Sequence, residues 1–321
     1  MQSIKIHPVY SFQFWKCYFI QMRPYLLFIS GIAGMTGMAM SPGFATAGWK
    51  VYVAIIPFFT GYGFGQALTD CFQTDTDKLS APYRPLSKGI VSVRSVLIVS
   101  IAGLLASGIV FYLLNPVCFL LSLLAVFGLA TYSIIKKRFW FAGPFYNAWI
   151  VALLPVMGYF SLTTASFKEY PQQFFPFIFI SFFSYSSFVL IGYLKDIEAD
   201  KATGYKTFPV VFGWNKTILA CDIIALTTVV LFWWFIDLYK LSLVWGITGT
   251  LVILTGQVIG HLAKHKSEKD ALIPILATVR SFVLLHIAVI LHFHSNLWPY
   301  ALVYYGLFEW ALYKRPSKYQ V

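Results

Sequence analysis

Charged residues are scarce in this chain. Only 11% of its 321 residues are Asp, Glu, Lys or Arg, whereas 59% are hydrophobic. A soluble domain could not bury so many apolar runs, so the composition excludes a soluble globular fold. Cysteine is also rare. Cys17, Cys71, Cys118 and Cys221 are scattered, which indicates neither a disulfide framework nor the paired spacing of a metal site.

Long apolar runs predict an all-α, polytopic transmembrane helical bundle. The first and last runs are short, so we expect nine or ten spans. No separate soluble domain is visible, and we treat residues 1–321 as a single integral-membrane domain. No cleavable signal peptide is visible before Arg23. The predicted spans cover residues 24–40, 49–69, 93–114, 116–135, 145–163, 174–194, 216–236, 241–262, 273–292 and 297–313.

The placement of lysine and arginine predicts the orientation. With a cytoplasmic N-terminus and ten spans, all but four of the 24 Lys and Arg residues fall in cytoplasmic segments. The exceptions are Lys50, Lys168 and Lys240 on the other side and Arg280 inside a span. This asymmetry follows the positive-inside rule. We therefore interpret the net charge of +12 as a signal that sets the topology and attracts the chain to anionic lipid headgroups. The sequence has no soluble basic face that would indicate a nucleic-acid partner.

Six of the 12 carboxylates gather in two acidic clusters, each at the end of a long apolar run. Carboxylates beside hydrocarbon are costly unless they are paired or bind a metal. Basic residues and a proline follow each cluster, and the four spans between them place both at the same end of the bundle. These features predict a site for a hard divalent metal and a phosphorylated ligand. The clusters occupy residues 70–77 and 196–200.

Helical spacing would align the side chains of each acidic cluster. If the second cluster continues its span as a helix, Asp196 and Asp200 lie one turn apart on one face. In the first cluster Asp70, Gln73 and Asp77 share a face by the same spacing. Facing clusters of this kind would hold Mg²⁺. The alternative is that both clusters are solvated acids at the starts of loops, paired with nearby lysines.

Tyr132 and Lys136 form a Tyr-x-x-x-Lys pair, one helical turn apart, at the cytoplasmic end of the fourth span. Lys136 would donate to a phosphate as a point charge. The alternative is that it anchors the span end beside Lys137 and Arg138, as the positive-inside rule expects.

Two further features within the spans stay open. Arg280 lies about two turns into its span and needs a partner, for which Glu309 and Asp222 are the candidates. The aromatic runs over residues 174–185 are denser than an interfacial belt requires. They line either an interior cavity or the lipid-facing surface.

The two acidic clusters resemble the signatures of UbiA-type intramembrane prenyltransferases. Residues 69–89 are similar to the family's Asn-Asp-x-x-Asp-x-x-x-Asp followed by Arg-Pro and a glycine. Residues 195–210 are similar to its Asp-x-x-x-Asp with Gly-x-x-Thr-x-Pro downstream. These two signatures together are highly specific.

Two shorter motifs corroborate the resemblance. Tyr132 and Lys136 match the family's Tyr-x-x-x-Lys, and Arg23 with Pro24 matches its opening Arg-Pro. All four motifs occur in the family's order and spacing. The resemblance covers residues 23 to about 215.

The resemblance implies a bundle around a central cavity open toward the membrane, in which Mg²⁺ bridges the acidic clusters to an isoprenyl diphosphate. Carried over by position, the implied metal ligands are Asp70, Gln73, Asp77, Asp196 and Asp200. The implied substrate-binding residues are Arg23, Thr69, Arg84, Lys136 and Lys201. The implied catalytic residues are Asp77, Asp196, Asp200, Tyr132 and Lys136.

Two replacements depart from the family pattern. Thr69 stands where the family usually has Asn, and Gln73 stands where it usually has a metal-binding Asp. A neutral amide oxygen can still bind a hard cation. One negative charge is nevertheless missing from the first cluster, so either metal affinity falls or Gln73 contacts the diphosphate in another way.

Three functions remain open at this point. The first is Mg²⁺-dependent transfer of a prenyl group from an isoprenyl diphosphate to an aromatic or other lipophilic acceptor. The second is a UbiA-type terpene cyclase, in which a double bond of the same substrate attacks the cation. The third is a non-catalytic membrane transporter or lipid-binding protein, which would not explain the Asp-rich loops. Prenyl chain length, acceptor identity and oligomeric state are not encoded in any motif.

Overall fold

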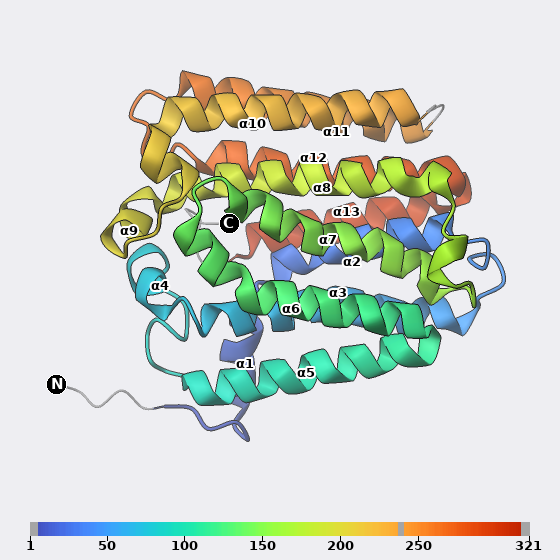
Figure 1. Ribbon diagram of the computed structural model, residues 1–321, viewed down its shortest axis with the longest axis horizontal. Coiled ribbons are helices and arrows are strands. Elements are labelled where there is room, and N and C mark those ends of the chain that lie inside the picture. Colours follow the sequence, from blue (N-terminus) through green and yellow to red (C-terminus); the bar gives the residue numbers. More distant parts are fainter. Residues whose placement is uncertain (1–5, 237–240, 316–321) are drawn as a thin grey trace.

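The computed structural model describes residues 6–236 and 241–315, which form a bundle of helices without a strand in that part of the chain (Figure 1). The long helices run side by side along the long axis of the molecule. They are α2 (Leu27–Met40), α3 (Trp49–Asp70), α5 (Val93–Leu114), α6 (Pro116–Arg138), α7 (Ala142–Ser161), α8 (Phe175–Gly192), α10 (Phe208–Phe235), α11 (Leu241–Leu262), α12 (Leu272–Phe293) and α13 (Trp298–Tyr313).

Each predicted span falls on one of these helices, which confirms the prediction of an all-α polytopic bundle. Seven described helices are long and apolar enough to cross a membrane by length and composition alone, and η1 (Pro24–Leu26) with α2 forms a shorter apolar segment. The chain is therefore an integral, multi-pass membrane protein. Lys5, Lys240 and Lys318, which the orientation argument counted, lie outside the described residues.

Local sequence sets the helix ends. The Ser92 side chain accepts a hydrogen bond from the Ser95 amide at 3.1 Å and caps α5. Asn115 caps α6 in the same way, and the proline after it occupies the first helical position. In α10 the backbone of Gly213 has a φ of 75°, which kinks the helix. The predicted span, which began at residue 216, covers only the part of α10 beyond this kink.

The sequence pattern did not single out the first helix, α1 (Phe12–Gln21). Phe14 and Tyr18 on one side of it are buried against the bundle. Trp15 and Phe19 on the other side are 48% and 55% exposed. Aromatic side chains of this kind are typical of a helix that lies at the membrane–water interface.

Glycines allow α2 and α7 to cross closely in the middle of the bundle. A Cβ atom at Gly158 of α7 would overlap the carbonyl oxygen of Gly34 on α2, and one at Gly37 would overlap the Pro155 carbonyl oxygen. These contacts involve backbone atoms, which cannot move aside as a side chain can. The close crossing holds α2 against α7. Arg23 lies just before α2 and Asn147 lies on α7, and both of these residues line the cavity described below.

Both acidic clusters lie at the same end of the bundle, as the count of spans predicted. The first lies at the end of α3 and in the short helix α4 (Thr74–Ser80), and the second in η4 (Tyr193–Asp196) and α9 (Ile197–Ala202). Figure 1 shows α4 and α9 as neighbours at its left side. A hydrogen bond of 3.0 Å between the Thr76 and Thr203 hydroxyls joins them.

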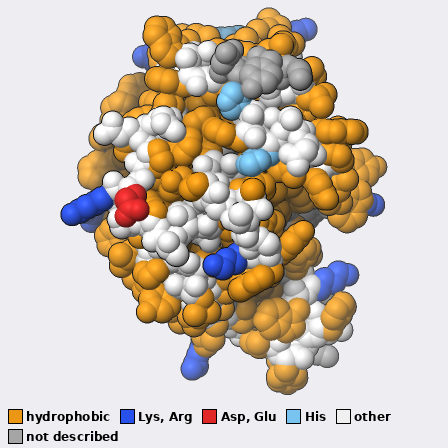
Figure 2. Space-filling view, turned by 90° about the vertical axis from the view of Figure 1, so that its right-hand side faces the viewer, with side chains coloured by type: hydrophobic (Ala, Val, Ile, Leu, Met, Phe, Trp, Pro, Cys, Tyr) orange, Lys and Arg blue, Asp and Glu red, His pale blue; other side chains and the backbone are white. Residues whose placement is uncertain are grey.

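The opposite end of the bundle carries few charges. Figure 2 shows this face as mostly hydrophobic and uncharged side chains, with scattered Lys and Arg among them. The polar chemistry of the molecule is therefore concentrated at the end that holds α4 and α9.

The first cluster does not continue its span as one helix, and the second continues its span only through a 3-10 turn. In the first cluster α3 ends at Asp70, the helix is interrupted over residues 71–73, and α4 begins at Thr74. In the second, α8 passes into the 3-10 turn η4 before α9 begins. Thr and Asp side chains compete for backbone hydrogen bonds and favour caps and turns over helix interiors, which explains the first break. The acids of each cluster therefore belong to different helical elements.

The close crossing predicts a cost for a large side chain on α7. Gly158→Leu forces α2 and α7 apart, and we expect it to destabilise the bundle by about 1–3 kcal/mol or more, the range of overpacked cores. Thermal unfolding of the purified protein in detergent measures this loss. Gly306→Leu on α13 is the matched control, because a Cβ atom there would meet no neighbouring part of the described chain within 4 Å. Equal melting temperatures for the two variants would contradict the crossing.

Candidate active site

A cavity of about 130 Å³ opens at the end of the bundle that carries both acidic clusters. Segments far apart in the sequence contribute to its wall: η1, α3, α4, α6, α8 and η4. Its polar lining mixes cations and carboxylates, which are Arg23, Arg84, Lys136, Lys195, Asp70, Asp77 and Asp196. The two clusters therefore converge on one chamber.

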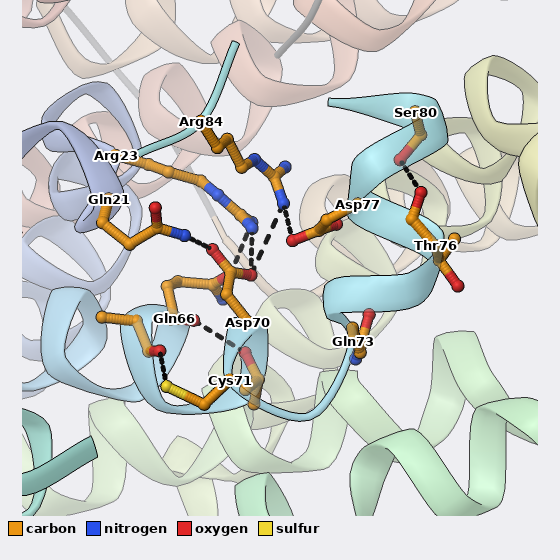
Figure 3. A network of polar contacts seen from close by, with 12 residues as sticks. Gln21, Arg23, Gln66, Asp70, Cys71, Gln73, Thr76, Asp77, Ser80 and Arg84 are labelled. Atoms are coloured by element: carbon orange, nitrogen blue, oxygen red, sulfur yellow. Dashed lines mark hydrogen bonds and ion pairs between the residues drawn. The ribbon is translucent and has the colours of Figure 1, made fainter. Parts of the chain in front are cut away.

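Arginines neutralise Asp70 in the first cluster (Figure 3). Arg23 Nη2 donates to Asp70 Oδ1 at 2.5 Å, and Arg84 Nη1 lies 3.5 Å from the same oxygen. The Gln21 side-chain amide donates to the other Asp70 oxygen. The Asp70 side chain is only 4% exposed, so these donors replace the water that the carboxylate has lost.

Arg23 reaches the cavity through an unusual backbone conformation. Its φ of 53° lies in the left-handed region, which costs a residue other than glycine about 1–3 kcal/mol. Besides the Asp70 contact, Arg23 Nη1 donates to Gln66 Oε1 at 2.6 Å. The ion pair and the hydrogen bond of the Arg23 guanidinium offset the cost of this backbone conformation. They also hold the positive charge of Arg23 at the cavity wall.

Arg84 joins the two carboxylates of the first cluster. Its Nη1 donates to Asp77 Oδ2 at 2.6 Å in addition to the contact with Asp70. Burial opposes the charge on Arg84, but the carboxylates of Asp70 and Asp77 outweigh burial and hold the pKa of Arg84 well above its ordinary value. The arginine therefore stays charged at any physiological pH.

The two departures from the family pattern both face the cavity. Gln73 Nε2 donates to Ser133 Oγ on α6 at 2.7 Å, so its amide is anchored on one side. Thr69 Oγ1 donates to the Gln66 carbonyl at 2.9 Å within α3. Figure 3 shows Gln73 set apart from the Asp70 network, at the start of α4.

Asp200 of the second cluster is fully buried and forms an ion pair with Lys136. Lys136 Nζ donates to Asp200 Oδ1 at 3.1 Å, and the Thr207 hydroxyl donates to Oδ2 at 3.1 Å. Asp196 instead lines the cavity, as does the adjoining Lys195. The two acids of this cluster therefore have different surroundings.

Lys136 belongs to the cavity and not to the membrane-anchoring lysines. It is 6% exposed, whereas Lys137 and Arg138 are exposed. Its Nζ lies 4.9 Å from the ring centre of Tyr193 and 5.0 Å from that of Tyr205. The geometry thus excludes the alternative in which Lys136 only anchors the end of its span.

Tyrosines surround the cavity wall next to Lys136. The Tyr132 and Tyr193 hydroxyls are 2.7 Å apart, and the Tyr62 and Tyr185 hydroxyls are 2.8 Å apart. All four residues line the cavity. Tyr185 comes from the aromatic run over residues 174–185, so part of that run faces the interior.

Sequence reasoning missed several residues of the cavity. Lys195 lines it one position before Asp196, and Gln66 lies on α3 one turn before Asp70. The spacing on α3 could have indicated Gln66, but no motif distinguishes Lys195 from the other lysines. Lys201, by contrast, is exposed and is not part of the lining.

An apolar pocket of about 80 Å³ adjoins the polar cavity. The two share lining residues, which are Tyr62, Gln66, Leu129 and Asn147. Phe58 and Phe111 line the pocket far from the charged end, and their ring centres lie 5.0 Å apart. The site is therefore polar at one end and apolar along its length.

The structure shows which acid pairs with Arg280, and this pair lies away from the cavity. Arg280 makes two hydrogen bonds to the Glu309 carboxylate, at 2.7 and 2.8 Å, so Glu309 is its partner. The other candidate, Asp222, contacts His261 at 2.6 Å. Neither pair takes part in the site.

Known proteins are similar to this chain in sequence. Residues 29–275 match the model of the UbiA prenyltransferase family. A digeranylgeranylglyceryl phosphate synthase of Methanothrix thermoacetophila is 25% identical over 210 residues, which are 65% of this chain and 76% of that protein. The synthase of the same name from Thermococcus kodakarensis is 27% identical over 209 residues, 65% of this chain and 73% of that protein.

Solved structures share the fold. The apo structure of a UbiA homolog from Aeropyrum pernix superposes with a TM-score of 0.67 at 20% identity, covering 79% of this chain and 94% of that chain. A UbiA homolog from Archaeoglobus fulgidus bound to DMAPP and Mg²⁺ superposes with a TM-score of 0.60 at 19% identity, covering 84% and 98%. The family match spans well over half of the sequence, and so the chain belongs to the UbiA prenyltransferase family.

Proposed function

We propose that this protein is a Mg²⁺-dependent intramembrane prenyltransferase that ionises an isoprenyl diphosphate and transfers the prenyl group to a lipophilic acceptor. The observation that carries the proposal is the convergence of both acidic clusters and four cations at the polar end of a chamber that continues into an apolar pocket. Such a chamber matches a substrate with an anionic head and a hydrocarbon tail.

The polar end supplies the groups that an allylic diphosphate needs to ionise. Arg23, Arg84 and Lys136 would bind the diphosphate and neutralise the charge that develops on it as the carbon–oxygen bond breaks. When bound, Mg²⁺ would add further positive charge to the leaving group. Asp196 would hold the metal with oxygens of the diphosphate, because carboxylate and phosphate oxygens suit this hard cation.

The tyrosines beside Lys136 would stabilise the allylic cation. Tyr132, Tyr185 and Tyr193 line the cavity next to the diphosphate-binding residues and present π-faces. The surrounding helices would exclude bulk water, which would otherwise capture the cation before the acceptor attacks.

The apolar pocket would hold the prenyl tail. Its burial contributes roughly 0.8 kcal/mol per CH₂ group. Phe58 and Phe111 would close the pocket at its far end.

We also propose that the N-terminus and both Asp-rich loops are cytoplasmic, and that residues 1–321 act as one domain. The distribution of lysine and arginine supports this orientation. A reporter that requires the cytoplasm, inserted in the loop over residues 81–92, is then expected to be active. Activity of an export-dependent reporter at the same position would overturn the orientation.

Product analysis tests the proposed function. We expect purified protein with Mg²⁺ to release diphosphate from isoprenyl diphosphates only when an acceptor is present. Acceptors to compare are geranylgeranylglyceryl phosphate, for which the synthase names of the relatives argue, and a prenylatable phenol. Products that contain no acceptor carbon would assign a terpene cyclase instead. Substrate binding without turnover of any kind would overturn the catalytic proposal.

The ion pair between Lys136 and Asp200 predicts a second result. Asp200→Asn leaves Lys136 buried without its counter-charge, so the lysine loses its fixed position beside the substrate. We expect diphosphate release to fall by about 100-fold or more, the range seen when one preorganised charge is removed. A steady-state assay of diphosphate release measures this effect.

Asp222→Asn is the matched control for Asp200→Asn. Asp222 pairs with His261 outside the cavity, so its replacement should leave turnover unchanged. Should Asp200→Asn fail to fold, Thr207→Val removes only the hydrogen bond to Asp200 and should lower turnover by a smaller factor. Full turnover of folded Asp200→Asn protein would contradict the assigned role of the pair.

The apolar pocket predicts a change in chain-length preference. Phe58→Ala opens the far end of the pocket, and we expect the ratio of kcat/KM values to shift toward longer isoprenyl diphosphates. Competition between diphosphates of different length measures the shift. Because a buried Phe→Ala change costs about 3–5 kcal/mol of stability, Phe58→Leu provides a milder variant.

Phe59→Ala is the control for the pocket. Phe59 is the neighbouring residue on α3 but packs against Phe28 and Tyr304, outside the pocket lining. It should lower stability without altering chain-length preference. An equal shift in both variants would show that the pocket does not hold the tail.

A further inference from the structure

We infer that a surface groove between α11 and α12 is a binding site for one anionic phospholipid, separate from the active site. The groove has a basic mouth and an apolar wall that follows both helices into the bilayer. Figure 1 shows the turn between these helices at the left side, the end of the bundle that also holds α4 and α9. The inference does not depend on the proposed function, because none of the residues that line the groove lines the cavity or the apolar pocket.

The mouth of the groove is a hollow of about 360 Å³ in the segment that joins α11 to α12. Lys264, His265 and Lys269 supply its basic lining, and Asp270 is the one acid among the described residues that line it. Asp270 Oδ2 accepts hydrogen bonds from the Ser267 amide at 3.0 Å and from the Ser267 hydroxyl at 3.1 Å, so this carboxylate serves the turn. Two lysines outnumber one carboxylate in the lining, and the mouth therefore favours an anionic group.

The other acids near the mouth lie on different sides of it. Burial, and then the charges of Asp196 and Glu198, raise the pKa of Glu268 above its ordinary value, so this carboxylate lies toward the second acidic cluster. Glu268 does not line the mouth. His261, at the end of α11, contacts Asp222 of α10, and neither residue lines the mouth. These acids therefore do not cancel the positive charge of the lining.

An apolar groove of about 300 Å³ continues the mouth along the bundle. The two hollows share Ile259 of α11 and Ile273 of α12, so they form one continuous depression. Gly256 and Ala277 both line the groove, and a Cβ atom at Gly256 would overlap the Cβ atom of Ala277. The two helices thus meet there with little side chain between them, which leaves room for a hydrocarbon chain along their contact.

The length of the groove matches one leaflet of a bilayer. Its lining on α11 runs from Ile259 to Thr248, which is roughly 16 Å at a rise of 1.5 Å per residue. One leaflet contributes about 15 Å to a hydrocarbon core of about 30 Å. A lipid with its headgroup at the mouth would therefore have an acyl chain in contact with α11 over the full depth of the leaflet.

Arg280 lines the deep end of the groove but does not attract a headgroup there. It makes two hydrogen bonds to the Glu309 carboxylate, at 2.7 and 2.8 Å, so this pair carries no net charge. A phosphate at this depth would also have to enter the hydrocarbon layer, which is costly. The charges of the groove thus place the headgroup at the mouth and the end of the tail near Arg280.

The charge of the mouth selects among phospholipids. Basic residues at the ends of spans attract anionic headgroups. Phosphatidylglycerol would present only its phosphate to Lys264 and Lys269, whereas phosphatidylcholine would bring its own cation to the same place. A lipid that contacts both α11 and α12 also stabilises their packing, because a ligand of the folded state raises the melting temperature.

Native mass spectrometry of the full chain in detergent tests this site. The probes are phosphatidylglycerol and phosphatidylcholine with the same acyl chains. We expect one tightly held phosphatidylglycerol per chain and a higher melting temperature with this lipid than with phosphatidylcholine. Equal retention of the two lipids, retention of neither, or binding of glycerol phosphate as tightly as the lipid would overturn the inference. A dimer free of lipid would overturn it too, and would assign the groove to a second copy of the chain.

A matched pair of lysines separates the groove from general surface attraction. Lys264→Gln should weaken phosphatidylglycerol binding by about fivefold, the factor for one lysine beside an anionic headgroup. Lys266→Gln removes the same charge from the same segment, but Lys266 does not line the mouth, so the affinity should stay unchanged. Equal losses in the two variants would contradict a defined site.

A second pair tests the apolar wall. Ile273→Trp fills the groove where its two hollows meet, and we expect it to lower phosphatidylglycerol binding to the level of phosphatidylcholine. Ile223→Trp on α10 is the control, because Ile223 is 62% exposed, Ile273 is 55% exposed, and Ile223 lies outside the lining. Both positions are at the surface, so neither change disturbs the packing of the bundle. Undiminished lipid binding by the Ile273→Trp protein would contradict the inference.

Discussion

The ion pair between Lys136 and Asp200 is the interaction on which the rest of the site depends. It joins α6 to α9, two elements far apart in the sequence, and both side chains are almost fully withdrawn from water. A charge buried in this way is costly unless it is paired and hydrogen-bonded, and Thr207 completes the pairing. The pair brings the second acidic cluster over the chamber that the first cluster closes from α3 and α4. The hydrogen bond between Thr76 and Thr203 links the two clusters directly.

The cavity then combines two ways of holding an anion. On one side, Arg23 and Arg84 are fixed by Asp70 and Asp77 and present planar donors that suit phosphate oxygens. On the other side, Asp196 lines the cavity together with Lys136 and Lys195, so this wall offers a carboxylate that would hold a metal and cations that would bind the anion. The left-handed backbone of Arg23 and the burial of Lys136 both cost free energy of folding, and both place a positive charge at the cavity. The apolar pocket beside these groups gives the hydrocarbon part of a substrate a place that excludes water.

The spans were predictable because hydropathy acts over whole helices. Every predicted range falls on a helix, and the common end of the two clusters followed from counting spans. The details of the site were less accessible, because they depend on where helices break. The interruption after Asp70 places Asp70 and Asp77 in different helices, and the 3-10 turn before α9 separates Asp196 from Asp200, which spacing alone did not indicate. Lys195 lines the cavity and Lys201 does not, although both flank the same acids, since side-chain direction is set by tertiary packing. Gln66 lay within reach of sequence reasoning, as it lies one turn before Asp70 on α3.

A structure of the protein with Mg²⁺ and an unreactive isoprenyl thiolodiphosphate tests the central claim most directly. The account predicts one headgroup between the clusters, in contact with Arg84 on one side and Lys136 on the other, with the tail directed toward Phe58. A headgroup that touches only one cluster, or that lies outside the chamber, would contradict it.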